Sequence, residues 1–291
     1  MATYFLGVDG GGTNCRIRLA DENLVTLADA NGGRSNLQIE DGDPAYKSIT
    51  EGTREVFAKA GIDFAETANT YACFGMAGGR LPSARKAFAE RPWPFAQVTV
   101  YDDIDIARAG AHGGEDGAVI IVGTGSAAMA LVNGQRHQAG GWGFHIGDQM
   151  SGAILGRELV RRAVEATDGL VSGSPLTEAT VQALGGNLDA VMDWSFKDRR
   201  PADYGALIPM LMDYYEKGDP VARELMDLEL SYIDNYVAWF KARGATKMAA
   251  VGGFGTRLYP LMEQRYGDFI VRPQHEPLHG AVILAKQNKS A

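Results

Sequence analysis

Apolar residues recur along the chain in two series of similar design. In the first series, residues 3–9 (TYFLGVD) have the pattern of a buried strand, and residues 16–21 (RIRLAD) alternate as a half-buried strand does, with Ile17 and Leu19 on one face. Helical spacing of apolar residues predicts an amphipathic helix over 45–60. The further elements expected in this series are strands over 24–30, 69–75 and 97–102 and a short helix over 81–90.

The pattern restarts after a glycine-rich stretch, residues 109–117. An apolar strand over 118–123, a glycine turn and a second strand over 127–132 repeat the outline of residues 3–20. The further elements expected in this series are helices over 151–166, 220–243 and 278–287 and a strand over 247–251. Strands followed by alternating helices and strands are typical of α/β domains, and two similar halves indicate a duplicated α/β fold.

The length of 291 residues suits two domains. We place the N-terminal domain at residues 1–108 and the C-terminal domain at 109–291, and we leave open that the last helix, about 278–289, returns to the N-terminal domain.

Composition and charge exclude several classes of partner. Apolar residues make up 45% and charged residues 22%, as in an ordinary globular protein, and the net charge of −8 argues against nucleic acid and anionic membranes as partners. The two cysteines, Cys15 and Cys73, form no C-x-x-C pair, which argues against a zinc or iron–sulfur site made by one chain. The sequence has no signal-peptide pattern and no apolar run of 18 residues, so we expect a cytoplasmic protein.

The segment Asp9–Asn14 reads Asp-Gly-Gly-Gly-Thr-Asn between two expected strands. Successive glycines let a backbone turn present bare N–H groups that bind phosphate oxygens, and Thr13 adds a hydroxyl donor. Asp9, at the strand end, is placed to hold Mg²⁺ through water. No Gly-Lys-Ser/Thr follows and no helix comes next, so this is neither a Walker A loop nor a dinucleotide fingerprint. The candidate phosphate-binding residues are Gly10, Gly11, Gly12, Thr13 and Asn14; an ordinary glycine hairpin is the alternative.

Two more glycine turns lie in the second half. Gly123-Thr124-Gly125-Ser126 repeats the chemistry of the first turn, so that the two turns together could clamp one triphosphate. Gly252-Gly253-Phe254-Gly255 follows a strand and precedes a helix, where the backbone could pass close to an adenine or ribose. A plain turn between strand and helix is the alternative for this second segment.

Acidic residues follow the strand over 97–102. A carboxylate at the C-terminal end of a strand faces the crevice where α/β proteins bind ligands, and Asp103 there could accept a proton from a sugar hydroxyl. Asp105 is a rival for this role. The alternative is that the Asp102-Asp103 pair only caps a helix.

The segment Gly140–Gln149 reads Gly-Gly-Trp-Gly-Phe-His-Ile-Gly-Asp-Gln. Its glycines allow close approach of a backbone, Trp142 offers an apolar face and Asp148 a bidentate acceptor, which together suit a ring that bears hydroxyls. The alternative is a loop before a helix, with Asp148 as the cap of that helix. His145 alone is more often structural than catalytic.

The order of these segments resembles the N-acetylglucosamine and glucosamine kinases of the BadF/BadG/BcrA/BcrD ATPase family, within the superfamily of sugar kinases, Hsp70 and actin. The resemblance runs from residue 4 to about 287, and GTGS (123–126) with GGWG (140–143) and Gly147-Asp148 is its most specific part. It implies two RNase H-like domains with a cleft between them, the first with the sugar site and the first phosphate loop, the second with the second phosphate loop and the adenosine site. It also implies ATP and Mg²⁺ as cofactors, an amino sugar as substrate with its 6-hydroxyl as acceptor, and a homodimer. It implies Asp103 as the catalytic base. The other implied contacts are Asn36, Thr124, Gly141, Trp142 and Asp148 for the sugar, Gly125 and Ser126 with Thr124 for phosphate, and Gly252, Gly253 and Gly255 for adenosine.

The chain also departs from the pattern of that family. Relatives frequently have Gly-Asp-Glu-Gly-Ser where this chain has Gly-Asp-Gln-Met-Ser at 147–151, which leaves the preferred amino sugar open. The alternatives are a kinase for another hexose, a sugar sensor without turnover, and an activator ATPase of a radical dehydratase or reductase. The activators hold an iron–sulfur cluster with cysteines from two subunits, for which neither Cys15 nor Cys73 looks suited.

Overall fold

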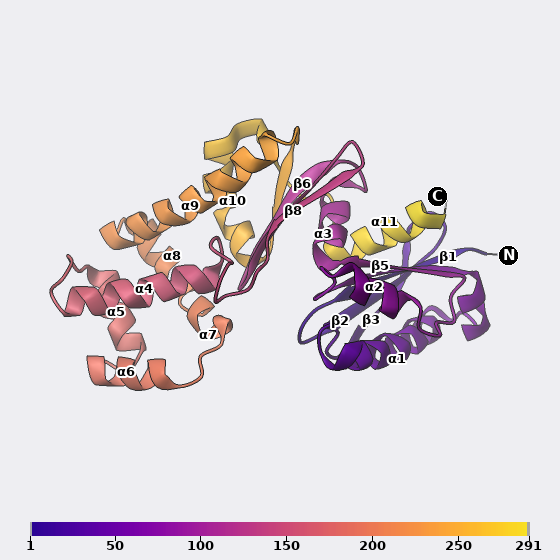
Figure 1. Cartoon of the computed structure of the whole chain (residues 1–291), viewed down its shortest axis with the longest axis horizontal. Helices are drawn as coiled ribbons and strands as arrows, with labels where there is room; N and C mark the ends of the chain where they lie inside the picture. Colours follow the sequence, from indigo (N-terminus) through magenta and orange to yellow (C-terminus); the bar gives the residue numbers. More distant parts are fainter. Residues whose placement is uncertain (1, 290–291) are drawn as a thin grey trace. The chain divides into compact units, whose positions relative to one another are not determined.

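The chain forms two compact units, which the computed structural model describes over residues 2–289 (Figure 1). Unit 1 contains the residues up to Val119 and those from Arg272 onward, and unit 2 contains Ile120–Val271. Unit 2 is thus inserted into the chain of unit 1, which the last helix completes.

Unit 1 is built around a five-stranded sheet of order β3-β2-β1-β4-β5. β1 pairs antiparallel with β2 and parallel with β4, so the chain enters the sheet as a hairpin and continues through crossovers. The strands are β1 (Tyr4–Gly10), β2 (Cys15–Ala20), β3 (Thr26–Gly32), β4 (Thr70–Met76) and β5 (Gln97–Asp102). The helical elements are η1 (Glu40–Gly42), α1 (Asp43–Ala60), η2 (Phe64–Asn69), α2 (Pro82–Ala89), α3 (Asp103–His112) and α11 (Pro277–Lys289).

Residues of β1 alternate between two apolar layers, as the period of a strand requires. Leu6 and Val8 face α1 and pack in one cluster with Ile49 and Phe57. Phe5 faces the other way and packs in a second cluster with residues of α3 and α11, among them Ile106 and Val282. The sheet therefore lies between α1 on one face and α3 with α11 on the other (Figure 1).

Glycines let α11 approach both β1 and α3 closely. A Cβ on Gly7 of β1 would lie 2.8 Å from Leu278 O and from a methyl carbon of Val282, both in α11. A Cβ on Gly280 of α11 would collide with the backbone of α3 at Ile106 and Gly110. The last helix is thus fitted onto unit 1 by the absence of side chains at these positions.

Unit 2 carries a second five-stranded sheet, of order β10-β9-β6-β7-β8. Counted from its own first strand, β6, this is the strand order of the first sheet, so the structure contains the same arrangement twice. The strands are β6 (Gly117–Val122), β7 (Ser126–Val132), β8 (Gln135–Gly140), β9 (Met248–Val251) and β10 (Ile270–Val271). The prediction of a duplicated α/β protein is confirmed.

Most of the helices belong to unit 2. α4 contacts α5, α7, α8 and α9, and α10 packs beside β9 (Figure 1). The helices are α4 (Gly152–Thr167), α5 (Pro175–Ala183), α6 (Leu188–Phe196), α7 (Pro201–Gly205), α8 (Ile208–Glu216), α9 (Pro220–Lys241) and α10 (Gly253–Tyr266), followed by η3 (Gly267–Phe269). The sequence predicted α4 and α9 but none of α5 to α8.

Within residues 2–289, no helix is both long and apolar enough to cross a membrane.

Candidate functional site

The first glycine turn joins β1 to β2 and carries the candidate phosphate-binding residues of unit 1. Its neck is closed by a hydrogen bond of 2.8 Å from Gly11 N to Asn14 O. Ser35 braces the turn, because its N–H and its Oγ both donate to Gly11 O at 3.0 Å. Gly12, Thr13 and Asn14 are exposed, and a Cβ on Gly12 would meet no atom within 4 Å. The tip of the turn is therefore open to a ligand.

Asp9 and Gly10 lie at the end of β1, just before the open tip. Gly10 is buried, and a Cβ there would lie 2.7 Å from Met76 Sδ. The Asp9 carboxylate pairs with Arg16 at 2.6 Å, and Arg16 pairs in turn with Glu276 at 2.6 Å. Arg16 thus ties the end of β1 to the residue that precedes α11.

The surroundings of Asp9 suit a magnesium ion that is held mainly by water and phosphate oxygens. Across residues 2–289, no group of three or more His, Cys, Asp or Glu side chains could hold a metal ion. Mg²⁺ in nucleotide sites keeps several waters and takes one or two carboxylates together with substrate phosphates. The half-buried Asp9 carboxylate beside an exposed phosphate turn fits that pattern, whereas a cage made by the protein alone does not.

Asp103 is the first residue of α3, directly after β5. Burial, and after it the neighbouring carboxylates of Asp102 and Asp9, raises the pKa of Asp103 to about 7. Part of the residue remains accessible. A carboxylate with a pKa near 7 can accept a proton from a hydroxyl group and release it again at neutral pH.

Asp102 and Asp105 form the N-terminal cap of α3. Asp102 is the N-cap residue, and Asp105 Oδ2 accepts a hydrogen bond of 3.2 Å from Asp102 N. Both residues are buried, with 4% and 5% of their surface exposed. The helix-cap interpretation thus holds for Asp102, and Asp105 serves the same cap. Asp103 is the one residue of the three that is not fully buried.

Asn36 lies in a segment that joins the first glycine turn to the loop after β4. Its neighbour Ser35 bonds to the turn, and Leu37 N donates to Ala77 O at 3.0 Å. Asn36 Oδ1 accepts from Gln38 N at 2.8 Å, so its NH₂ group is the part that can serve a ligand.

The loop after β4 brings Asn36 and the start of α3 into one neighbourhood. A Cβ on Gly78 would collide with Asn36 Oδ1, and a Cβ on Gly79 would lie 3.0 Å from the Cα of Asp102. The predicted sugar contact Asn36 and the predicted base Asp103 therefore lie on two sides of the same short glycine loop in unit 1.

The second glycine turn joins β6 to β7 in unit 2, and its backbone is hydrogen-bonded to the start of α4. Gly123 N donates to Gly125 O at 3.0 Å, and Gly123 O accepts from Gly152 N, at the start of α4, at 2.8 Å. The side chain of Thr124 lines a pocket, whereas Ser126 is buried, with 5% of its surface exposed.

Asp148 supports this turn from the loop after β8. Its carboxylate accepts hydrogen bonds from the backbone N–H groups of Gly143 and Ser126, and burial raises its pKa. The residue is 8% exposed and has a φ of +60°, which is uncommon for a residue other than glycine. The alternative in which Asp148 caps the next helix is wrong, because Ser151 Oγ accepts from Ile154 N at 3.2 Å and is the cap of α4.

Trp142 is the exposed member of the same loop, with 60% of its surface accessible. Gly141 and Gly143 beside it have positive φ angles, of 69° and 85°. A Cβ on Gly147 would lie 2.8 Å from the Cβ of Trp142, so the loop folds back on itself at that point. Gly141 and Trp142 thus present backbone and an aromatic face to solvent, while Asp148 lies beneath them.

The three glycines after β9 differ in the atoms that surround them. Gly252 has a φ of +96°, and a Cβ there would lie 2.5 Å from Val122 O of β6. A Cβ on Gly255 would lie 3.3 Å from the Cβ of Val122, so this glycine also serves packing. A Cβ on Gly253 would meet nothing within 4 Å, and Gly253 lines the pocket.

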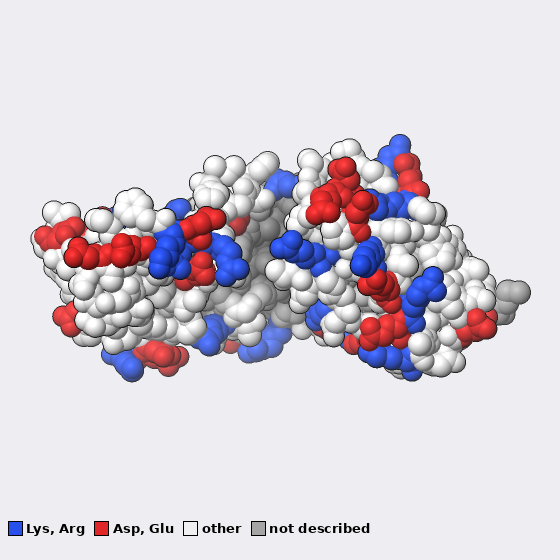
Figure 2. All heavy atoms as spheres, turned by 90° about the horizontal axis from the view of Figure 1, so that it is seen from below, with Lys and Arg blue, Asp and Glu red and all other residues white. Residues whose placement is uncertain are grey.

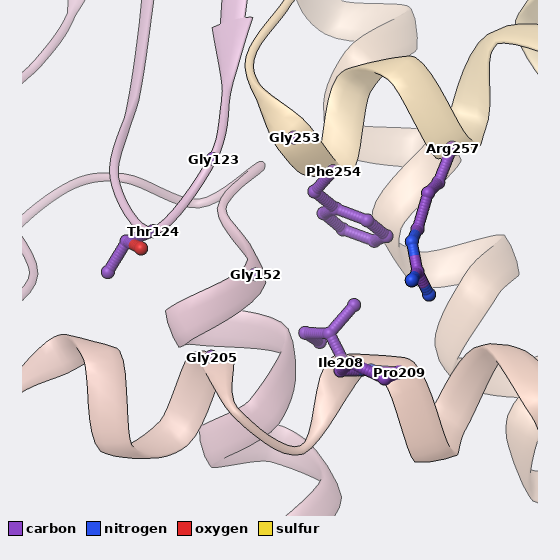
Figure 3. Close-up of a pocket in the computed structure, with 9 residues that line it drawn as sticks. All are labelled: Gly123, Thr124, Gly152, Gly205, Ile208, Pro209, Gly253, Phe254 and Arg257. Atoms are coloured by element: carbon purple, nitrogen blue, oxygen red, sulfur yellow. The ribbon is translucent and has the colours of Figure 1, made fainter.

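A pocket of about 310 Å³ in unit 2 brings together the second glycine turn and the glycines after β9 (Figure 3). Its lining includes the first residues of three helices: Gly152 of α4, Ile208 of α8 and Gly253 of α10. Helix N-termini carry partial positive charge and favour anions such as phosphate. The remaining lining residues are Gly123, Thr124, Gly205, Pro209, Phe254 and Arg257.

Several of these lining residues were missed from the sequence. Ile208, Pro209 and Arg257 belong to no glycine segment, and their helices meet the second turn only in the folded unit. Phe254 was noticed only as a member of its segment. The one available signal was the spacing of Phe254 and Arg257, which places both on one side of a helix.

The two cysteines are buried thiols of unit 1. Cys15 and Cys73 both have 0% of their surface exposed, and burial raises the pKa of each to about 12. Both side chains lie inside the core of unit 1, where they do not reach a surface at which a cluster could be shared with a second chain.

Charged residues of both signs are interspersed over each unit on the face that Figure 2 shows. On this face, neither unit carries charges of one sign alone.

Two sheets of one strand order, each with a glycine turn between its first two strands, are typical of the actin-like, RNase H-like fold of sugar kinases and ATPases. The sequence model of the BadF/BadG/BcrA/BcrD ATPase family matches residues 6–285, and the chain belongs to that family.

Known relatives extend over nearly the whole chain. Glucosamine kinase GspK of Vibrio cholerae is 30% identical over 97% of this chain and 95% of its own. A solved structure from Chromobacterium violaceum, described as a candidate N-acetylglucosamine kinase, has 31% identity and a TM-score of 0.84 over 97% of this chain and 99% of its own. A glucokinase of the ROK family from Streptomyces griseus, solved with glucose and AMPPNP, shares the fold at 17% identity, with a TM-score of 0.60 over 100% of both chains. The expected fold class is thus confirmed.

Proposed function

We propose that the protein is an ATP-dependent kinase of a hexosamine, with N-acetylglucosamine or glucosamine as the substrate. The family and the names of its relatives support a kinase of this class. Within this proposal the 6-hydroxyl group of the sugar accepts the γ-phosphoryl group. A cytoplasmic homodimer is the expected form of the protein.

One observation carries the proposal most directly: Asp103 is a partly accessible residue near the first glycine turn, and burial and neighbouring carboxylates raise its pKa to about 7. Phosphoryl transfer requires positioning and charge neutralisation more than covalent chemistry by the protein. In this role Asp103 accepts the proton of the attacking hydroxyl. The nearby Asn36 donates its NH₂ group to the sugar.

The nucleotide contacts follow from the turns. The exposed N–H groups around Gly12 and Thr13 in unit 1, and Thr124 with the helix N-termini of the unit 2 pocket, are suited to phosphate oxygens. Mg²⁺, when bound, neutralises phosphate charge, and Asp9 would hold it through water. Gly253 leaves room for the nucleoside.

The loop after β8 supplies the remaining proposed sugar contacts. Gly141 and the exposed ring of Trp142 suit a polar ring with one apolar face. The buried Asp148 accepts hydrogen bonds from two backbone N–H groups, one in this loop and one in the second turn. We therefore expect Asp148 to position the loop; direct contact with the sugar would require the loop to open.

An ADP-release assay over a panel of sugars tests the proposal. We expect turnover with N-acetylglucosamine or glucosamine at least tenfold above that with glucose, mannose or galactose, and a product phosphorylated at position 6 by NMR. Turnover confined to sugars without an amino group would contradict the hexosamine assignment. ATP hydrolysis that no sugar accelerates would contradict the kinase assignment.

A further inference from the structure

Arg257 is the one charged side chain among the nine residues that line the unit 2 pocket. It lies on α10, one helical turn after Gly253, and its side chain extends beside the ring of Phe254 toward α8, where Ile208 and Pro209 lie (Figure 3). Over residues 2–289, the structure records no hydrogen bond or ion pair for its guanidinium group. In contrast, Arg265 on the same helix pairs with Asp234 through two hydrogen bonds. The N–H donors of the Arg257 guanidinium group are therefore available to a ligand in the pocket.

The rest of the lining offers little to distinguish one base from another. Ile208, Pro209 and Phe254 are apolar, and four of the other lining residues are glycines. Thr124 has the only other polar side chain, and it belongs to the second glycine turn. A volume of about 310 Å³ is at the lower end for ligand pockets, which suits a planar base between apolar walls. Apart from Thr124, Arg257 is therefore the one lining side chain that can distinguish one purine base from another by hydrogen bonds.

We propose that Arg257 contacts the purine base and that the pocket accepts guanine and hypoxanthine nucleotides as well as adenine nucleotides as phosphoryl donors. This inference rests on the proposed kinase function. Arginine has five N–H donors and no acceptor. Guanine and hypoxanthine present two acceptors, O6 and N7, on one edge, which match an arginine fork. Adenine presents N7 beside its N6 amino donor, so the same fork can satisfy only one position there.

The first experiment compares nucleotides with the unaltered protein. Initial rates of amino sugar phosphorylation are measured with ATP, GTP and ITP at matched Mg²⁺ concentrations. We expect the kcat/KM with GTP and with ITP to lie within tenfold of the value with ATP. A kcat/KM with GTP more than tenfold below that with ATP would overturn the inference. If ATP supports turnover and GTP does not, the kinase proposal stands and only the base assignment fails.

The second experiment exchanges the recognition chemistry at one position. Glutamine donates and accepts, and it matches the N6 and N7 edge of adenine. We expect Arg257→Gln to lower the ratio of the GTP to the ATP kcat/KM by about tenfold or more. Arg265→Gln, on the same helix but outside the pocket, is the matched control and should leave that ratio unchanged. An unchanged ratio in Arg257→Gln would also overturn the inference.

Binding gives a readout that does not depend on turnover. Calorimetric titration with ADP and with GDP should give dissociation constants within tenfold of each other for the unaltered protein. Arg257→Gln should weaken GDP binding relative to ADP binding, and thermal unfolding of the variant should show whether the fold is kept. Loss of both affinities by the same factor in a folded variant would mean that Arg257 does not select the base.

Discussion

Asp103 in unit 1 and Glu229 in unit 2 are both carboxyl groups whose pKa burial raises, to about 7 and about 8. Their surroundings differ. Asp103 begins a helix, remains partly accessible and lies near other carboxylates and an open glycine turn. Glu229 lies in the middle of α9 with 0% of its surface exposed, and neither carboxylate oxygen has a hydrogen-bond partner among residues 2–289.

The comparison separates a group suited to proton transfer from a buried acid. A perturbed pKa marks a functional site only together with access and suitable neighbours. Asp103 has both, whereas Glu229 is an acid that the protein keeps neutral inside a helical unit. The two residues should therefore differ in what their replacement changes: the rate for Asp103 and the stability for Glu229.

The largest expected effect is that of Asp103→Asn on the rate. Loss of a general base commonly lowers a rate by about 10²–10⁴. We therefore expect kcat to fall by at least about 100-fold, with the melting temperature and nucleotide affinity preserved. In the unaltered protein, kcat/KM should rise with pH through about 7, because the base must be deprotonated. Turnover by Asp103→Asn close to that of the unaltered protein would exclude Asp103 as the base.

Glu229→Met should change the pH dependence of stability instead. The folded protein keeps the Glu229 proton up to about pH 8, whereas the unfolded chain loses it near the ordinary value of 4.5. The contribution of Glu229 to stability therefore falls as pH rises from about 4.5 to about 8 and is level above that. One pH unit of such linkage corresponds to about 1.4 kcal/mol.

We expect Glu229→Met to gain about 2–4 kcal/mol relative to the unaltered protein between pH 5 and pH 8, measured by urea unfolding. Sugar phosphorylation at 25 °C should be unaffected. A constant difference in stability at all pH values would mean that Glu229 does not titrate in this window.

The smallest expected effect is that of Asp102→Asn. Asparagine caps a helix about as well as aspartate does, so α3 should keep its start. Removal of the Asp102 charge should lower the pKa of Asp103, because that charge contributes to raising it. We expect the acidic limb of the kcat/KM profile to move to lower pH by about half a unit. A limb that does not move would show that the charge of Asp102 does not contribute to the pKa of Asp103.

Much of the fold could be predicted from the sequence, because its strands and long helices have clear periodic patterns. The restart of the pattern near residue 118 was enough to predict two similar sheets. α3 was expected only as the alternative in which the Asp102-Asp103 pair caps a helix, because the glycine-rich stretch at 109–117 indicated a domain boundary. The short helices α5 to α8 were missed because they lack a strong local pattern; α5, α7 and α8 form where they pack against the longer helices α4 and α9.

The candidate site was less accessible to sequence reasoning. The glycine turns could be found, since glycine runs between strands are visible in the chain itself. The burial of Asp148 beneath its loop and the division of tasks between Gly252 and Gly253 could not, because both depend on contacts with β6 or β7. Arg257 was missed because a lone arginine on a helix usually faces solvent.

The return of α11 to unit 1 affects the order in which the two units can fold during synthesis on the ribosome. The face of β1 that carries Phe5 packs against Ala281, Val282, Leu284 and Ala285 of α11, which are synthesised only after the whole of unit 2. Unit 2, in contrast, is a continuous stretch of chain and can fold as soon as residue 271 has emerged. The unit that begins the chain should thus be the later of the two to mature, and a truncation before residue 277 should leave it with one apolar surface uncovered.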